Sequence, residues 1–436
     1  MKAESASTTV PAPPTPSLMS KSSFFRQSGW MVIAAIISGG LMYAVHKIAG
    51  KMPKDEYGVF TTLLQVLNQM AIPAAGLQLT FVQQTVSATT EEGRRRLTGT
   101  MRALLGGTFA LWLLIALGAF LFRDHWIARF QITNPAALWV TVLLGLASLW
   151  GPIMLGVLQG RQNFLWLGWA NMLNGLTRFV SITVIVMGLG GYAAGGMTGA
   201  LLGMLVAMSI AVWQTWSLWQ GPADRFQWLP WLKRMAPLTL GFGAVTYMLT
   251  QDMLVVQQYF PKDQTGYYGA AGMIGRALFF FTAPVTQVLF PKLVQSAVRA
   301  EKTSVLAQAM GATALMGMGA ALFCTFFPEV PLRIIYDASF LKVAPLVPLF
   351  AWCMLPLILS SVLVNNLLAR ERFAVVPFLI AIAAGYVFAL EHVGHKHGAE
   401  GMEGFAAVIK TLGLFSSLLL GVCLIFTFWD ARKKSA

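Results

Sequence analysis

The chain has 436 residues, of which 56% are hydrophobic and 11% are charged, and its mean hydropathy is +0.65. Soluble domains carry about 25% charged residues, so this composition excludes a soluble globular protein and predicts an integral membrane protein. The net charge of +14 would suggest nucleic acid as the partner of a soluble protein. In a membrane protein, basic segments on one side explain such a charge, so we expect no nucleic-acid partner.

Residues 1–22 are rich in Ser, Thr and Pro, and we expect a disordered cytoplasmic tail there. The first apolar run is too long for the core of a signal peptide, so we interpret it as a retained span. A span needs about 20 apolar residues, and by that measure the sequence predicts about twelve transmembrane helices. Their ranges are about 25–48, 58–82, 103–122, 137–158, 164–187, 194–216, 237–260, 266–290, 304–327, 344–368, 373–390 and 407–428.

Basic residues concentrate in alternate connecting segments. If the N-terminus is cytoplasmic, the inner segments hold about twice as many Lys and Arg residues as the outer ones. The inner set includes the run 91–96, which we interpret as a solvated cytoplasmic loop that contributes to topology and touches anionic lipid. The positive-inside rule therefore predicts that both termini are cytoplasmic.

The sequence contains a duplication. The segment PKDEYG at 53–58 resembles PKDQTG at 261–266, and GRQNF at 160–164 resembles ARERF at 369–373, at nearly the same separation. An even number of predicted spans separates the copies, so the halves are parallel repeats about an axis along the membrane normal. We expect an all-α protein with two six-helix bundles, 23–220 and 221–436, arranged as a V around a central cavity.

Ionisable residues inside the predicted spans are the first candidates for a functional site. Burial of a charge in a membrane costs about 2.5–3.5 kcal/mol even on insertion scales, so such groups face protein or a wet cavity. Asp252 and Arg276 lie on adjacent spans, and Arg178 lies in the fifth span. Two interpretations stay open: Asp252 and Arg276 form a structural ion pair, or Arg276 and Arg178 line the cavity and bind an anion, for which Arg is well suited. Lys410 lies close enough to a span end to reach the outer surface.

Polar side chains also follow one face of two predicted spans. Gln65, Asn68 and Gln69 share a face of the second span, and Asn171 and Asn174 share a face with Arg178 in the fifth. Asn68 is the repeat counterpart of Arg276. Such stripes either form hydrogen bonds between helices or line a hydrophilic cavity, and the nearby buried charges favour the cavity.

Two prolines occupy similar places in the repeats. Pro73 lies in the second span and Pro284 in the eighth. Each removes a backbone hydrogen bond, so we expect kinks that suit helices bending as a cavity opens.

Several other chemistries lack support. The sequence has no P-loop for ATP binding, no catalytic triad and no paired carboxylates, so we predict neither an enzyme nor a cofactor. The three cysteines lie in apolar runs and predict neither disulfides nor zinc. We interpret the histidines between Glu391 and His397 as part of a solvated outer loop, and we predict no metal site.

The chain resembles the polysaccharide-transport branch of the multidrug/oligosaccharidyl-lipid/polysaccharide exporter superfamily, the O-antigen and capsule flippases. The resemblance covers about residues 25–428. It is carried by Glu56-Tyr57-Gly58, Leu158-Gln159-Gly160-Arg161 with Phe164, Asp252, Gly266-Tyr267-Tyr268 with Ala270, Ala271 and Arg276, Phe290-Pro291, and Leu368-Ala369-Arg370-Glu371-Arg372.

This resemblance implies a MATE-like fold in the bacterial cytoplasmic (inner) membrane. It also implies a flippase that moves an undecaprenyl-pyrophosphate-linked oligosaccharide by alternating access, for lipopolysaccharide, capsule or exopolysaccharide synthesis. Cationic cavity residues would engage pyrophosphate or acidic sugars, here Arg276 and Arg178. The implied partners are this lipid-linked oligosaccharide, membrane lipids and glycan polymerase or export machinery.

Three alternatives remain at this stage. Cation-coupled drug exporters of the same superfamily use membrane-embedded carboxylates of the first bundle, but the acids between residues 24 and 218 lie in predicted loops, which leaves only Asp252 for coupling. Peptidoglycan-precursor flippases carry charges in the middle of the first span, which is apolar here from Trp30 to Val45. A membrane-bound sugar polymerase or glycosyltransferase would need a catalytic outer loop, and the predicted outer loops are short.

Overall fold

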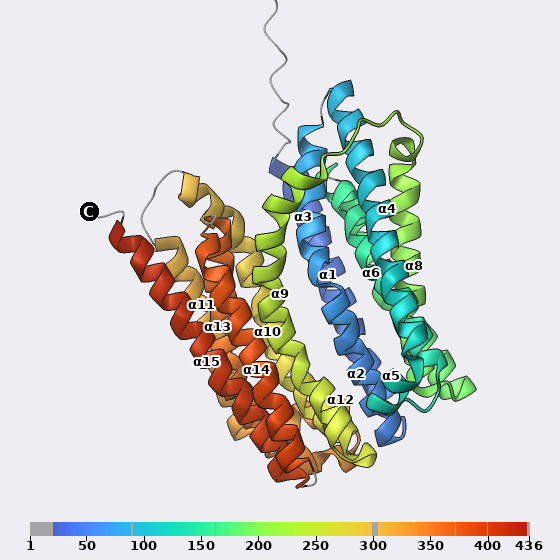
Figure 1. Cartoon of the computed structure of the whole chain (residues 1–436), viewed down its shortest axis with the longest axis vertical. Helices are drawn as coiled ribbons and strands as arrows, with labels where there is room; N and C mark the ends of the chain where they lie inside the picture. Colours follow the sequence, from blue (N-terminus) through green and yellow to red (C-terminus); the bar gives the residue numbers. More distant parts are fainter. Residues whose placement is uncertain are drawn as a thin grey trace, which may run out of the picture.

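The computed structural model describes residues 21–88, 90–161, 163–298, 304–370, 372–398 and 400–433. Across these ranges all the regular secondary structure is helical. Figure 1 shows long helices gathered into two bundles, one from each half of the chain. The predicted all-α fold class is therefore confirmed. The predicted tail falls mainly on residues outside the described ranges.

The first bundle follows the predicted spans with one break. Span two consists of two helices that meet at Ala71, and Pro73 lies in the first turn of the second, so the predicted kink is present. The fifth span ends in a π-helical segment, Thr183–Gly188. The helices are α1 (Lys21–Ala49), α2 (Lys54–Met70), α3 (Ile72–Ser87), α4 (Glu91–Leu121), α5 (Arg123–Arg129), α6 (Ala136–Gly160), α7 (Phe164–Ile182) and α8 (Tyr192–Trp219).

The second bundle repeats this order. The short α12 separates its third and fourth long helices, as the short α5 does in the first bundle. The helix containing Pro284 is continuous at that position. The helices are α9 (Trp228–Tyr259), α10 (Lys262–Val298), α11 (Ser304–Phe326), α12 (Glu329–Ile335), α13 (Leu346–Ala369), α14 (Val376–His397) and α15 (Met402–Lys433).

Two charged segments predicted as loops are helical. The run 91–96 forms the first turns of α4, because the Thr90 hydroxyl caps the helix by accepting a hydrogen bond from the Gly93 amide at 3.1 Å. Residues 391–397 form the last turns of α14. Both segments are charged, so the length of the neighbouring apolar run does not show that the helix continues through them.

The membrane-capable helices differ in how much of their apolar surface the protein itself buries. Eight helices of the described chain are long and apolar enough to cross a membrane, and the apolar window of α4 is only 11% buried within the protein. The other four predicted spans correspond to α1, α2 with α3, α9 and α10. The strongest contacts between the bundles join α2 to α9 and α10, and α3 to α9. These helices carry polar side chains that bond between the bundles, as Gln69 does to α9, and within the second bundle, as Tyr268 does to Asp252.

Candidate functional site

The two repeated PKD segments meet at one end of the molecule. Gly58 of α2 lies against the Thr265 side chain of α10, and Gly266 lies against the backbone carbonyl of Lys54. A Cβ added to either glycine would clash, so the missing side chains permit α2 and α10 to approach closely. The duplicated motif therefore joins the bundles. The glycine of each copy packs against a residue of the other copy.

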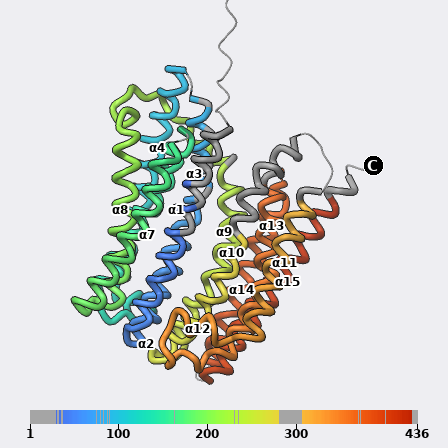
Figure 2. The backbone as a smooth tube through the Cα atoms, turned by 180° about the vertical axis from the view of Figure 1, so that it is seen from behind, coloured from blue at the N-terminus to red at the C-terminus, as the bar shows by residue number. Residues whose placement is uncertain are grey.

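A chain of hydrogen bonds lies beside this crossing. Nδ1 of His46 on α1 is 2.9 Å from the hydroxyl of Tyr57, which is 2.7 Å from the hydroxyl of Tyr336, the residue after α12. All three residues are buried. Figure 2 shows α2 and α12 at this same end of the molecule. Lys54 adds a cation–π contact, with Nζ 3.4 Å from the ring centroid of Phe340.

A second set of polar contacts links the bundles at the same end. The Arg129 guanidinium of α5 lies 3.2 Å from a carboxylate oxygen of Glu391 on α14, and the Tyr259 hydroxyl donates to the other oxygen. Gln131 donates to the Gln257 carbonyl at 2.8 Å, and Gln257 donates back to the first bundle, to the Phe130 carbonyl at 3.1 Å. This end of the interface is therefore closed by packing and by reciprocal hydrogen bonds.

The polar residues predicted on one face of α2 differ in their contacts: one bonds to another helix and one is exposed. Gln69 donates from its amide to the side chains of Thr250 and Gln251 on α9, both at 3.0 Å, so it bridges the bundles. Asn68 donates to Gln65 within the helix at 3.2 Å and is itself exposed, whereas Gln65 is buried. Asn68 thus presents a polar surface at the middle of the α2–α3 span.

Asp252 and Arg276 form a compact cluster inside the second bundle. An Arg276 Nη is 2.6 Å from one carboxylate oxygen of Asp252, and the Tyr268 hydroxyl donates to the other at 2.8 Å. Arg276 Nε donates to the Leu249 carbonyl at 3.0 Å. Both charged side chains are at most 4% exposed. The structure has the geometry of the structural pair, and a substrate role for either residue stays a prediction.

Arg178 is in a different situation inside the first bundle. Its described contact is from an Nη to the Met42 sulfur of α1 at 3.3 Å, and its buried Nε lacks a hydrogen-bond partner among the described residues. A Cβ on Gly203 of α8 would lie 3.1 Å from Arg178 Cβ, so α8 crowds the base of the side chain. The guanidinium therefore extends towards α1, and no carboxylate of the described residues pairs with it.

The surroundings of Arg178 are polar and locally irregular. Asn171 and Asn174, the other predicted residues of this face, are both partly buried on α7. The π-helical segment Thr183–Gly188 begins about one turn beyond Arg178, and such segments are frequent at functional sites. Two polar side chains of α7 and a local departure from α-helical geometry therefore lie close to Arg178 along the chain.

Sequence reasoning missed three buried polar residues. Glu56, counted as a loop acid, is buried at the start of α2, where it accepts hydrogen bonds from the Thr133 hydroxyl and from the Ala193 amide of α8. His46 and Tyr57 form the hydrogen-bonded chain described above. The available signal was the position of His46 near the end of an apolar run and of Glu56 and Tyr57 within the repeated motif.

The remaining candidates are Lys410, the histidines near the end of α14 and the cysteines. Lys410 is exposed. His397 pairs with Glu400 at 2.5 Å, and His395 lies 3.1 Å from the Tyr259 hydroxyl. Among the described residues, no three His, Cys, Asp or Glu side chains gather as a metal site would require. Cys324, Cys353 and Cys423 are free thiols.

Solved structures share this architecture. A multidrug-resistance MATE transporter of the MOP superfamily, in an inward-facing conformation, has a TM-score of 0.67 at 14% identity, with 92% of this chain and 96% of that one covered. The lipid II flippase MurJ, in an inward closed conformation, has a TM-score of 0.67 at 14% identity, covering 91% and 86%. A MOP transporter from Pyrococcus furiosus has a TM-score of 0.62 at 14% identity, covering 94% and 95%.

No family model and no curated protein matches the sequence itself. At 14% identity the structural likeness is a likeness of fold, and drug transporters and a lipid flippase share it equally. The chain is a multi-pass membrane protein with the fold of MATE and MOP-superfamily transporters.

Proposed function

We propose that the protein is a flippase that moves a polyprenyl-pyrophosphate-linked oligosaccharide across the bacterial cytoplasmic membrane by alternating access, with both termini in the cytoplasm. The sugar chain would serve lipopolysaccharide, capsule or exopolysaccharide synthesis. Glycan polymerase or export machinery would take the product. The work is translocation, and no bond is made or broken.

The observation that carries this proposal is the charge of Arg178, which no carboxylate in the described ranges balances. The Arg178 side chain is partly buried and its Nε is fully shielded. A charge held at membrane depth without a counter-charge is costly. A substrate that brings an anion would remove that cost on binding. Pyrophosphate and acidic sugars have this chemistry, and a guanidinium binds their oxygens with two parallel hydrogen bonds. Arg276, the stronger candidate on sequence grounds, has its charge balanced by Asp252.

The closed end supports alternating access. Contacts of α2 with α9 and α10 hold one end of the interface together. Polar bridges add to them, from α5 to α14 and from the segment after α5 to α9. With the orientation that the basic residues predict, this is the outer end, and the present state is closed to the outside. Alternating access requires that this end open.

The buried acids count against a cation-coupled drug exporter. In the first bundle, Glu56 is the buried carboxylate among the described residues, and it accepts hydrogen bonds from Thr133 and Ala193. In the second bundle, Asp252 is occupied by Arg276 and Tyr268. A coupling site needs a carboxylate that can exchange its partner for H⁺ or Na⁺. Drug export is therefore the second candidate, with Asp252 as its coupling residue, and export of a peptidoglycan precursor is the third.

The test is complementation of a deletion strain. We expect that loss of the gene leaves lipid-linked oligosaccharide facing the cytoplasm, that Arg178→Ala does not restore surface polysaccharide, and that Arg178→Lys restores part of it. Lys410→Ala, which removes an exposed cation, is the matched control and should restore export fully. Normal surface polysaccharide with a well-expressed Arg178→Ala protein would refute the role of this residue. Drug accumulation in the deletion strain without a glycan defect would identify an exporter instead.

A further inference from the structure

A separate pocket lies within the first bundle, at the end opposite the closed one. It has a volume of about 490 Å³ and is formed where α3 ends, α4 begins and α8 ends, with Arg161 entering from the turn after α6. Small-molecule sites in proteins are about 300–1,000 Å³, so the pocket is large enough for a ligand. The charged residues among its lining are Glu91, Arg94, Arg95 and Arg161. The excess charge is therefore two positive units.

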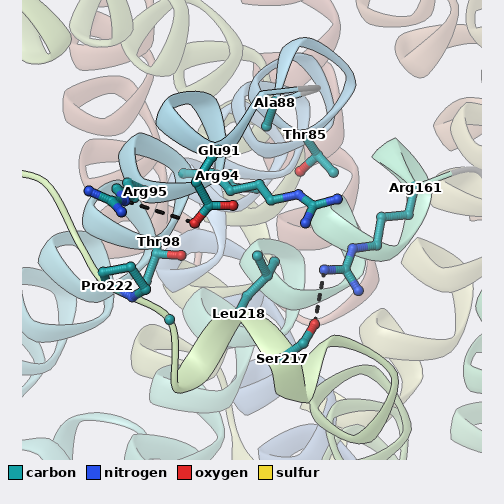
Figure 3. Close-up of a pocket in the computed structure, with 12 residues that line it drawn as sticks. Thr85, Ala88, Glu91, Arg94, Arg95, Thr98, Arg161, Ser217, Leu218 and Pro222 are labelled. Carbon is teal, nitrogen blue, oxygen red and sulfur yellow. Dashed lines mark hydrogen bonds and ion pairs between the residues drawn. The ribbon is translucent and has the colours of Figure 1, made fainter.

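The arginine triplet at the start of α4 is not uniformly paired. Arg95 lies 3.8 Å from Glu91, and Arg96 lies 2.5 Å from Glu92, both as i, i+4 pairs along the helix. Arg94 makes no side-chain hydrogen bond or ion pair with the described residues. Figure 3 shows the Arg94 guanidinium extending across the pocket towards Arg161. One guanidinium of the three is thus left for a ligand.

Arg161 approaches the same space from the other side. One Nη donates to the Gln214 carbonyl at 3.2 Å, and the other lies 3.4 Å from the Ser217 hydroxyl. These contacts orient the side chain but leave part of its five-donor guanidinium free. Burial, and then the charge of Arg94, lower the pKa of Arg161 below its usual value. The two guanidiniums therefore repel each other, and an anion between them would relieve that repulsion.

The wall of the pocket is held in place independently of these two arginines. Arg102 of α4 donates to the carbonyls of Trp219 and Gly221 at 2.6 and 2.9 Å, which fixes the segment that follows α8. The Asp224 amide donates to the Arg95 carbonyl at 3.2 Å and ties the same segment to α4. The site is therefore preformed, and removal of Arg94 should leave its walls unchanged.

We propose that this pocket binds a phosphate group held between Arg94 and Arg161. The ligand class is a phosphate ester, and the pocket volume exceeds what a bare phosphate ion requires. The lining comes entirely from the first bundle at helix ends, where a lipid headgroup at the membrane surface has access. Basic pockets between transmembrane helices on the cytoplasmic side are suited to anionic headgroups. This site is distinct from Arg178, and occupancy would brace α3, α4 and α8 against one another.

The experiment uses the full-length protein in detergent, titrated with short-chain phosphatidic acid and with phosphatidylcholine of the same chains. Inorganic phosphate is titrated in a separate arm, and binding is followed by native mass spectrometry. We expect Arg94→Ala to weaken phosphatidic acid binding about tenfold, because a charge-assisted contact is lost. Arg96→Ala removes the same charge from a side chain paired with Glu92, and is expected to change affinity less than about twofold.

Equal weakening by Arg94→Ala and Arg96→Ala, or no weakening by either, would overturn the proposal. Preference for phosphatidic acid over inorganic phosphate supports a lipid headgroup as the ligand. Comparable Arg94-dependent affinities for both support the same site with a soluble phosphate ester as its ligand. Arg161→Ala should reproduce the loss seen with Arg94→Ala, and retention of full affinity in that variant would also contradict the proposal.

Discussion

The two bundles share a scaffold but differ in how the arginine within their spans is paired. Arg276 of the second bundle lies against Asp252, with a further bond to a backbone carbonyl, and is almost fully shielded. Arg178 of the first bundle has a methionine sulfur as its described contact and a buried Nε without a partner. A duplicated fold can therefore repeat its helices while only one half keeps its charge balanced. An anionic ligand would therefore supply a counter-charge in the first bundle, at Arg178.

The largest expected effect is on the free energy of unfolding, when the counter-charge of one arginine is removed. Asp252→Ala leaves Arg276 buried without a counter-charge, and we expect a loss of about 3–5 kcal/mol. Arg178→Met removes a charge that no described side chain balances, and should leave stability unchanged or raise it. Thermal unfolding of both proteins in the same detergent measures the contrast. Comparable destabilisation by the two substitutions would mean that Arg178 also has a structural counter-charge.

The double substitution Asp252→Leu with Arg276→Met sharpens the same comparison. Replacement of both members of a buried ion pair by apolar residues is often neutral or stabilising, so most of the Asp252→Ala loss should be recovered. The same thermal unfolding measurement serves here. A double variant as unstable as Asp252→Ala would show that Tyr268 and Leu249 depend on the charges for their positions.

The closed end offers a prediction on conformation. Gly58→Val places a branched side chain against Thr265 where even a Cβ does not fit, so α2 and α10 must separate. Spin labels are attached at the exposed positions Lys51 and Lys262. Double electron–electron resonance should then show a longer or broader distribution of distances between the two labels. The same labels on Gly106→Val, a position with open space around its Cα, form the control. An unchanged distribution in Gly58→Val would contradict the assignment of this crossing as the closed gate.

A smaller effect is expected from the short helices. Arg129 of α5 reaches across to Glu391 of the other bundle, whereas Arg333 of α12 pairs with Glu329 on its own helix. Arg129→Ala should therefore shift the gate towards the open state by on the order of 1 kcal/mol, and Arg333→Ala should not. The spin-label distances given above measure both. Equal responses would show that the bridge between bundles does not hold this end closed.

Sequence reasoning reached the scaffold more easily than the site. Apolar run lengths and the two PKD segments were sufficient for the all-helical fold, because membrane spans need long continuous apolar stretches and duplication leaves local matches. The pairing of Asp252 with Arg276 was one of two open interpretations, because sequence spacing places both at similar depth but does not give the rotation of either helix. Whether a described carboxylate pairs with Arg178 depends on which helices surround it.

The pocket at the start of α4 could not be predicted from the sequence, because it also depends on how distant segments pack. The run 91–96 holds two Glu and three Arg residues, and the sequence alone predicts a loop there. Because it is helical, Arg95 and Arg96 form ion pairs with the Glu residues four positions earlier, whereas Arg94 forms none with the described residues. Arg161, far away in the sequence, then defines the opposite wall. Local charge patterns predict a helix face, whereas a binding pocket depends on the packing of distant segments.

The central claim is that Arg178, and not Arg276, supplies the cation that recognises substrate. The direct measurement is flipping of a fluorescent polyprenyl-pyrophosphate oligosaccharide in proteoliposomes containing equal amounts of each purified variant. Arg178→Met should lower the flipping rate about tenfold or more, since a charge-assisted contact is lost, while the Asp252→Leu, Arg276→Met double variant retains most of it. Full activity in Arg178→Met together with loss in the folded double variant would contradict the account and return the substrate role to the second bundle.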